Sequence, residues 1–236
     1  DIPAVLYSYR IFWPLYTYSS LYTRQALIFI FAAGPVLSLV IAILFYRIFI
    51  RIRLLCVNFK ILTLWVLFHS INLFFGAYIA GVITRTGFVY TTEWIFYSQV
   101  FGIEEIIFLI ACISVLVISG LFLTRHFLAA TCMPVMNESK IRIFYILAQV
   151  FLPWFLGMVV LAMINYPRNP PELLILYIAS ALMIIPILFS FNTPDNQNIR
   201  VGSSVKQGRI GWIYFGLLMI ALVFIRKVIY QGINFY

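Results

Sequence analysis

The sequence contains few charged side chains: only 10% of its 236 residues are charged, and only seven of these are acidic. No Asp or Glu lies within the core of any long apolar segment. Proton and sodium pumps normally carry such side chains inside their membrane spans. The shortage of acids therefore argues against a pump mechanism.

Cysteine is equally scarce, with three residues. Cys56, Cys112 and Cys132 show no CxxC or similar spacing, which argues against a disulfide framework and a structural zinc site. The sequence also has no HExxH motif, no phosphate-binding loop and no GxSxG nucleophile motif. We therefore expect no metal site, no cofactor and no catalytic residue, and regard an enzyme as the less favoured class.

Apolar residues are abundant instead. They make up 64% of the chain, and the mean hydropathy is +1.05. Soluble domains are about half apolar and about a quarter charged, so these values indicate a membrane protein. The net charge is +9, but the basic residues cluster at the ends of apolar segments, where they meet lipid headgroups. Membrane lipids and other membrane subunits are the expected partners, and nucleic acid is not.

Long apolar segments account for most of the chain. About 20 apolar residues in a helix cross roughly 30 Å of hydrocarbon, and continuous runs favour helices over a closed barrel. We therefore predict an all-α integral membrane protein, a six-helix bundle with short loops, forming one domain over residues 1–236. The predicted spans cover about 25–46, 61–83, 103–123, 143–164, 173–191 and 210–225.

Orientation follows from the basic residues in the loops, because cytoplasmic loops are enriched in Lys and Arg. The loops after the first, third and fifth spans carry ten: Arg47, Arg51, Arg53, Lys60, Arg125, Lys140, Arg142, Arg200, Lys206 and Arg209. The other side carries six: Arg10, Arg24, Arg85, Arg168, Arg226 and Lys227. This bias predicts that both termini lie on the non-cytoplasmic side of a bacterial inner membrane or an organellar inner membrane.

The first 24 residues are rich in Tyr, Phe and Trp but contain Arg10 and Pro14. Aromatic rings with polar tips favour the headgroup layer, so residues 1–24 are predicted to form an interfacial arm. A partner-docking arm is the alternative. The first apolar run has full span length and no small-residue cleavage site, so no cleavable signal peptide is expected.

The second predicted span contains the best candidate site. His69, Asn72, Gly76 and Ala80 share one helical face by their three- and four-residue spacing. Gly76 with Ala80, and Ala77 with Gly81, form two overlapping small-xxx-small pairs, which let helices approach closely. The polar pair His69 and Asn72 either packs against a neighbouring helix or lines a site for a ligand or proton.

A pair of glutamates and the two histidines are further candidates for binding sites. Glu104 and Glu105 open the third predicted span, where they either favour the helix dipole or bind a cation. The two histidines do not match as haem ligands. His69 lies about 13 Å deeper than Lys60 by helical rise, whereas His126 follows Arg125 at the cytoplasmic end of the third span.

Three hypotheses of function follow. The favoured one is a non-catalytic membrane subunit or scaffold of a larger membrane protein complex, because catalytic motifs are lacking and small residues suit helix packing. The second is a carrier of a small or lipid-like solute through a polar site near the second span. Pro35, Pro153 and Pro186, which permit kinks, would serve such a carrier. The third is an intramembrane enzyme acting on a lipid-linked substrate.

Overall fold

The computed structural model describes residues 4–6, 11–12, 24–51, 57–84, 103–130, 139–167, 171–193, 219–229 and 233–235. Within these ranges almost every residue is helical. Five helical stretches are long and apolar enough to cross a membrane: α1 (Arg24–Arg51), α2–η2–α3 (Val57–Thr84), α5 (Ile103–Ala130), α6–η3–α7 (Ser139–Asn165) and α8 (Pro171–Ser190). The chain is therefore a helical, membrane-embedded protein, and five of the predicted spans are confirmed.

The sixth predicted span, 210–225, is only partly described. Residues 219–229 are helical, and their last turn is the π-helix η4 (Ile225–Ile229), while residues 210–218 lie outside the described part. Arg226 is one of the six basic residues assigned to the non-cytoplasmic side. It donates from Nη1 to the carbonyl oxygens of Ile164 and, at 2.7 Å, of Tyr166. It thereby occupies carbonyls at the end of α7 (Leu152–Asn165) that have no intrahelical partner.

Two helices extend beyond their predicted ends. α1 continues to Arg51, and α5 continues to Ala130, so Arg125 and His126 are helical residues and not loop residues. Phe127 and Leu128 explain the extension of α5, because both are buried among the other helices. Burial against the other helices thus extends α5 beyond Arg125, the charged residue that follows the predicted apolar span.

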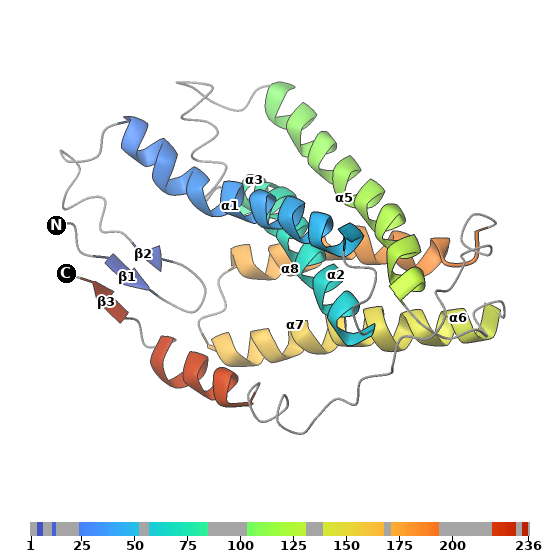
Figure 1. Cartoon of the computed structure of the whole chain (residues 1–236). Helices are drawn as coiled ribbons and strands as arrows, with labels where there is room; N and C mark the ends of the chain where they lie inside the picture. Colours follow the sequence, from blue (N-terminus) through green and yellow to red (C-terminus); the bar gives the residue numbers. More distant parts are fainter. Residues whose placement is uncertain are drawn as a thin grey trace.

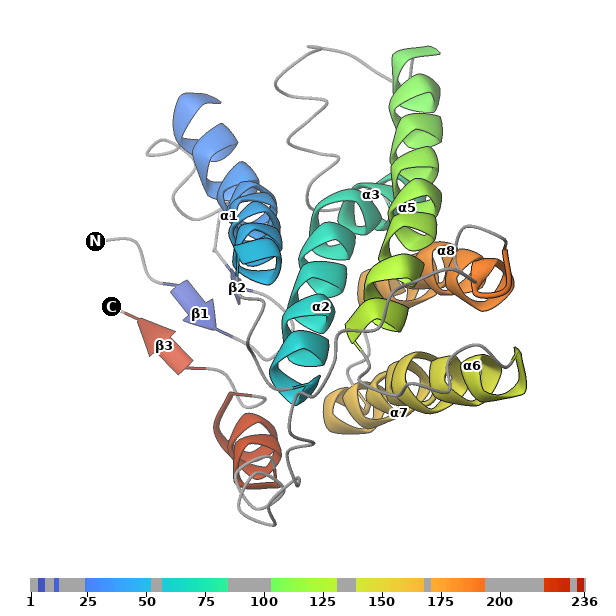
Figure 2. The same ribbon diagram turned by 45° about the vertical axis from the view of Figure 1, so that its right-hand side comes forward.

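Successive helices run in alternating directions, as Figure 1 shows from the colour of each ribbon. In Figure 2, α2 (Val57–Ile71) lies between α1 and α5, and it packs against both of them. α8 packs against both α5 and α3 (Ala77–Thr84). Helix α8 therefore occupies the centre of the bundle, and α1 lies at its edge.

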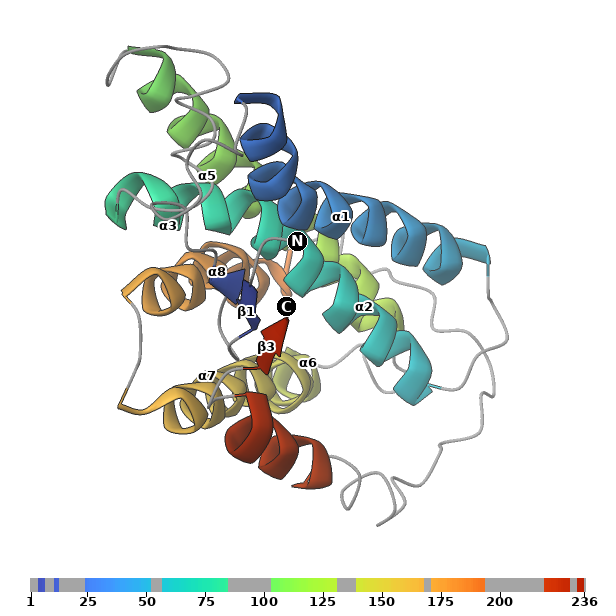
Figure 3. The ribbon, with the colours of Figure 1, turned by 90° about the vertical axis from the view of Figure 1, so that its left-hand side faces the viewer.

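Three short strands join the two ends of the chain. β1 (Ala4–Leu6) pairs antiparallel with β2 (Ile11–Phe12) and with β3 (Ile233–Phe235), giving the order β2-β1-β3. The termini consequently lie together, beside the last helix (Figure 3). The described part of the arm predicted over residues 1–24 thus contains strands β1 and β2, and the place of the arm at a membrane interface stays a prediction.

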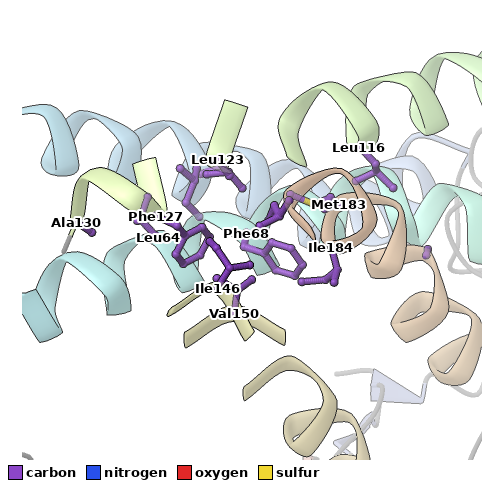
Figure 4. Packing of buried hydrophobic residues seen from close by; sticks show 14 of the residues in the cluster. Leu64, Phe68, Leu116, Leu123, Phe127, Ala130, Ile146, Val150, Met183 and Ile184 are labelled. Atoms are coloured by element: carbon purple, nitrogen blue, oxygen red, sulfur yellow. The ribbon is translucent and has the colours of Figure 1, made fainter. Parts of the chain in front are cut away.

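The apolar core lies where α2, α5, α6–η3 and α8 meet (Figure 4). Several of its side chains are fully buried: Leu64, Phe68, Leu116, Leu123, Phe127, Val150, Met183 and Ile187. In contrast, only 6% of the most apolar window of α1 is buried, against 50% for the second span. The protein therefore has a filled interior and broad apolar outer faces.

Gly120 sets the distance between α5 and α8. A Cβ atom built at Gly120 would lie 2.4 Å from the carbonyl oxygen of Met183 and 2.9 Å from its Cα. Such distances are shorter than real Cβ contacts, so only glycine permits this backbone approach. Small residues at helix crossings act in this way in membrane proteins.

We expect Gly120→Ala to lower the free energy of unfolding by about 1–3 kcal/mol, because the added methyl group forces the two backbones apart. Gly157→Ala is the matched control, since a Cβ there meets no atom within 4 Å and alanine favours helix. Thermal denaturation in detergent, followed by size-exclusion chromatography, measures both. Equal midpoints for the two variants would contradict the close approach.

Candidate functional site

Asn72 is the buried polar residue of the second span. It begins the π-helix η2 (Asn72–Gly76), is only 4% exposed, and donates from Nδ2 to the carbonyl oxygen of Leu176 at 3.1 Å. Leu176 belongs to α8, so this bond joins helices that are far apart in sequence. A π-helical turn widens the helix and often marks a special site. Here it brings an amide group against α8.

The amide oxygen of Asn72 lies over Gly76. A Cβ atom at Gly76 would come within 2.3 Å of Asn72 Oδ1 and 3.3 Å of Leu176 Cδ1. Among the described residues Oδ1 has no conventional hydrogen-bond partner. The hydrogen-bearing Cα of Gly76 supplies a weak donor at this place. Asn72, Gly76 and Leu176 therefore form one interlocked contact, and the predicted small-residue role of Gly76 has a specific geometric cause.

His69 lies elsewhere. Its side chain is exposed on the outside of the bundle, whereas Asn72, Gly76 and Ala80 are buried. The imidazole stacks on Trp65, with ring centroids 5.5 Å apart and planes at 26°, and meets Phe68 edge-on at 5.3 Å. The shared face predicted for all four residues is therefore wrong at His69. Three residues on a helix are about 60° apart, which here separates the interior from the outer surface.

The other small residues of the second span lie on the inner side. Ala80 and Gly81 are buried, and Ala77 is half-buried. Their helix, α3, packs against α8 and α5. These positions agree with the packing role that the small-xxx-small spacing predicted.

The two glutamates belong to the first turn of α5. Glu105 is half-buried in the first turn of α5, and the side chain of Glu104 lies outside the described part. Between α2 and α5 the interior holds fully buried apolar side chains, among them Leu64, Phe68 and Leu123 (Figure 4). This part of the described interior is therefore apolar, and a cation site at the two carboxylates stays a prediction.

Several interhelical hydrogen bonds were not foreseen. Thr124 Oγ1 and Ser190 Oγ lie 2.8 Å apart between α5 and the end of α8, and both residues are buried. The indole Nε1 of Trp154 donates to Ser180 Oγ at 2.7 Å. Tyr145 donates from its hydroxyl to the carbonyl of Phe127 at 3.2 Å. All three bonds satisfy polar groups that would be costly in hydrocarbon.

The contacts on α8 follow one stripe, which we call the α8 seam. Its members recur every three or four residues, the spacing of one helical face: Leu176, Ser180, Met183, Ile187 and Ser190. Asn72, Trp154, Gly120 and Thr124 reach Leu176, Ser180, Met183 and Ser190 in turn. The serine spacing in a strongly apolar helix is the sequence signal that could have revealed this seam.

Arg142 is another residue whose predicted position differs from its position in the structure. It was counted as a cytoplasmic loop residue, but it lies in α6 (Ser139–Ile146) and is only 4% exposed. Its Nη2 donates to Asn192 Oδ1 at 3.1 Å, just beyond the end of α8. The guanidinium thus joins the fourth helical stretch to the end of the fifth.

His126 sits in an aromatic cluster at the end of α5. Its ring centroid is 4.3 Å from that of Phe122, 5.3 Å from that of Phe49 and 6.0 Å from that of Tyr46. Phe49 and Tyr46 come from α1, so these rings hold the peripheral helix to α5. Cys56 and Cys132 lie outside the described residues, within which no group of three metal-binding side chains occurs.

Comparisons with known proteins add no identity. No family model matches the chain, and neither the curated proteins nor the solved structures give a match. Function must therefore be argued from the geometry, in which several of the described interior polar side chains join one helix to another.

Gly76→Ala should destabilise the protein, since its methyl group collides with the Asn72 amide oxygen. Asn72→Ala should also destabilise it, by about 1 kcal/mol for a lost intramembrane hydrogen bond. We expect the double variant to lose less stability than the two single variants lose together, because removing the Asn72 amide removes the collision. A double-mutant cycle on thermal midpoints measures this coupling, and strict additivity would contradict it.

Proposed function

We propose that the chain is a non-catalytic integral membrane subunit or scaffold of a larger membrane protein complex. The observation that carries this proposal is the use of interior polar groups for packing. Asn72, Thr124 and Trp154 each bond to α8 or its end. A catalytic or transport site would instead leave such groups facing a cavity that a substrate can reach.

The outer surface supports the same proposal. Helix α1 exposes large apolar side chains along most of its length, including Phe29, Leu37 and Ile43. Lipid can cover such a face, and so can the spans of another protein. A subunit of an assembly is expected to offer faces of this kind, because membrane helices associate by packing with little hydrophobic driving force.

This proposal predicts association with other membrane proteins. In a mild detergent the 27.3 kDa chain should migrate in native electrophoresis at several times its own mass, together with other proteins in fixed ratio. A harsh detergent should release it as a monomer, which serves as the control. A chain that remains monomeric and unaccompanied in the mild detergent would contradict a subunit role.

We further propose that both termini lie on the non-cytoplasmic side of a bacterial or organellar inner membrane. The basic residues favour this orientation by ten to six. The pairing of β1 with β3 agrees with it, since it requires both ends of the chain to be at the same end of the bundle.

Cysteine labelling tests the orientation. In a chain lacking its own cysteines, Ser203→Cys should react with a membrane-impermeant maleimide only after the membrane is opened. Thr91→Cys should react in intact cells or organelles, because it lies between the second and third spans on the opposite side. The reverse labelling pattern would overturn the proposed orientation while leaving the helical fold untouched.

A carrier of a small or lipid-like solute is the second candidate. It is favoured by three π-helical turns, η2, η3 (Leu147–Phe151) and η4, in the second, fourth and last helical stretches. Such turns weaken the regular hydrogen-bond ladder and permit bending, and Pro153 lies two residues beyond η3, in the first turn of α7. The native electrophoresis separates the two candidates, because a carrier requires no partner subunit.

A further inference from the structure

The outward face of the second span, formed by α2 and η2, has an unusual composition. Leu62, His69 and Leu73 are exposed along it, with Leu62 at 57% and Leu73 at 45% exposure. Spacings of seven and four residues put them on one side of the helix. Because half of the second span is otherwise buried, this stripe is narrow. We call these three residues the His69 face.

His69 lies near mid-depth. The second span runs from Asn58 to Thr84, so His69 is eleven residues from one end and fifteen from the other. At helical rise these separations are about 16 and 22 Å. Headgroups and water are therefore far from the imidazole, and its ring is too short to reach them as a lysine side chain would.

The imidazole carries one donor and one acceptor nitrogen. Among the described residues, the contacts of the imidazole are with the rings of Trp65 and Phe68. These ring contacts provide no hydrogen bond to the imidazole nitrogens. Acyl chains offer no hydrogen-bond partner, so a polar side chain facing them is costly. A polar group from outside this bundle would remove that cost.

We propose that the His69 face docks a transmembrane helix of a partner protein that carries a carboxylate or carboxamide side chain at the depth of His69. This inference rests on the proposed function and names the surface through which it acts. A carboxylate accepts the imidazole N–H, and a carboxamide both donates and accepts. Leu62 and Leu73, above and below, supply the apolar contacts of such a helix pair.

A second copy of this chain fits the face less well. Its span cores contain no acid, and its mid-span carboxamide, Gln149, is half-buried in η3. The mid-span hydroxyls of Ser38 and Ser114 already donate to Gly34 O and Ile110 O. The chain also has a net charge of +9, which a partner with acidic groups complements and a second copy does not. The partner is accordingly a different protein.

Site-specific photo-crosslinking in native membranes tests the proposal. A photoreactive phenylalanine replaces Leu62 or Leu73, and the same residue at Leu37 or Val40 on the exposed side of α1 is the control. Both positions on the His69 face should crosslink to one protein, within a transmembrane segment that carries Asp, Glu, Asn or Gln. That polar residue should lie about one helical turn from the Leu73 crosslink and about two turns from the Leu62 crosslink. Mass spectrometry identifies that segment.

The role of the imidazole is tested in the same system. His69→Phe retains the ring against Trp65 but loses both nitrogens, so the crosslink yield should fall by about three- to tenfold. His69→Gln keeps a donor and an acceptor and should retain most of the yield. His69→Phe, which keeps the ring contacts, should not change the thermal midpoint of the isolated chain. The midpoint would fall if the imidazole nitrogens served internal packing.

Specific outcomes overturn the inference. Crosslinks to lipid only, to a second copy, or to a segment without a polar side chain would each do so, as would equal yields for the wild type and His69→Phe. If a partner co-purifies but crosslinks from α1 only, the docking face is wrong and the subunit role stands. If no partner co-purifies in mild detergent, both the docking face and the subunit role fail.

Discussion

The backbone contact between Gly120 and Met183 determines how the rest of the bundle packs. Because α5 and α8 approach so closely there, the side chains above and below the crossing must interdigitate at short range. Leu116 and Leu123 lie one turn to either side of Gly120, and both are fully buried. α8 in turn contacts α3, η2 and η3. Moving α8 outward would therefore loosen every interior surface at once.

Polar side chains reinforce this arrangement at several heights along the α8 seam. Asn72 bonds near the start of α8, Trp154 near its middle and Thr124 at its end. Each bond is worth about 1 kcal/mol or less in a membrane, so their sum is modest. These hydrogen bonds contribute mainly to the specificity of helix packing. In hydrocarbon an unpaired amide or hydroxyl is costly, so any other register between the helices that breaks these bonds is disfavoured.

A packed and bonded interior leaves the outer faces as the places where this protein can meet others. α1 is held mainly by α2 and by the ring cluster around His126, and most of its surface is exposed. The second span differs, because its exposed stripe is narrow and holds an imidazole. The two faces therefore have different chemistry, one suited to lipid and one to a specific contact.

The predicted spans were largely correct because each helix needs about 20 apolar residues to cross the bilayer. A run of that length can be recognised from the local sequence alone. Their ends were less accurate, since burial of Phe127 and Leu128 extends α5 past Arg125. The three short strands were missed. β1 and β3 pair residues at opposite ends of the chain, and no local pattern encodes that pairing. Small residues at Gly76 and Ala80 were correctly assigned to packing, but His69 was placed on the wrong side.

Hydrophobic length and the scarcity of charge thus determined by themselves that this chain is a helical membrane protein. Tertiary structure alone decided which side of each helix is inside. Helical spacing defines a face but does not say what lies against it, and in a membrane apolar residues suit both the core and the lipid. For this reason Asn72, Arg142 and Ser190 are interior contacts while His69 faces outward.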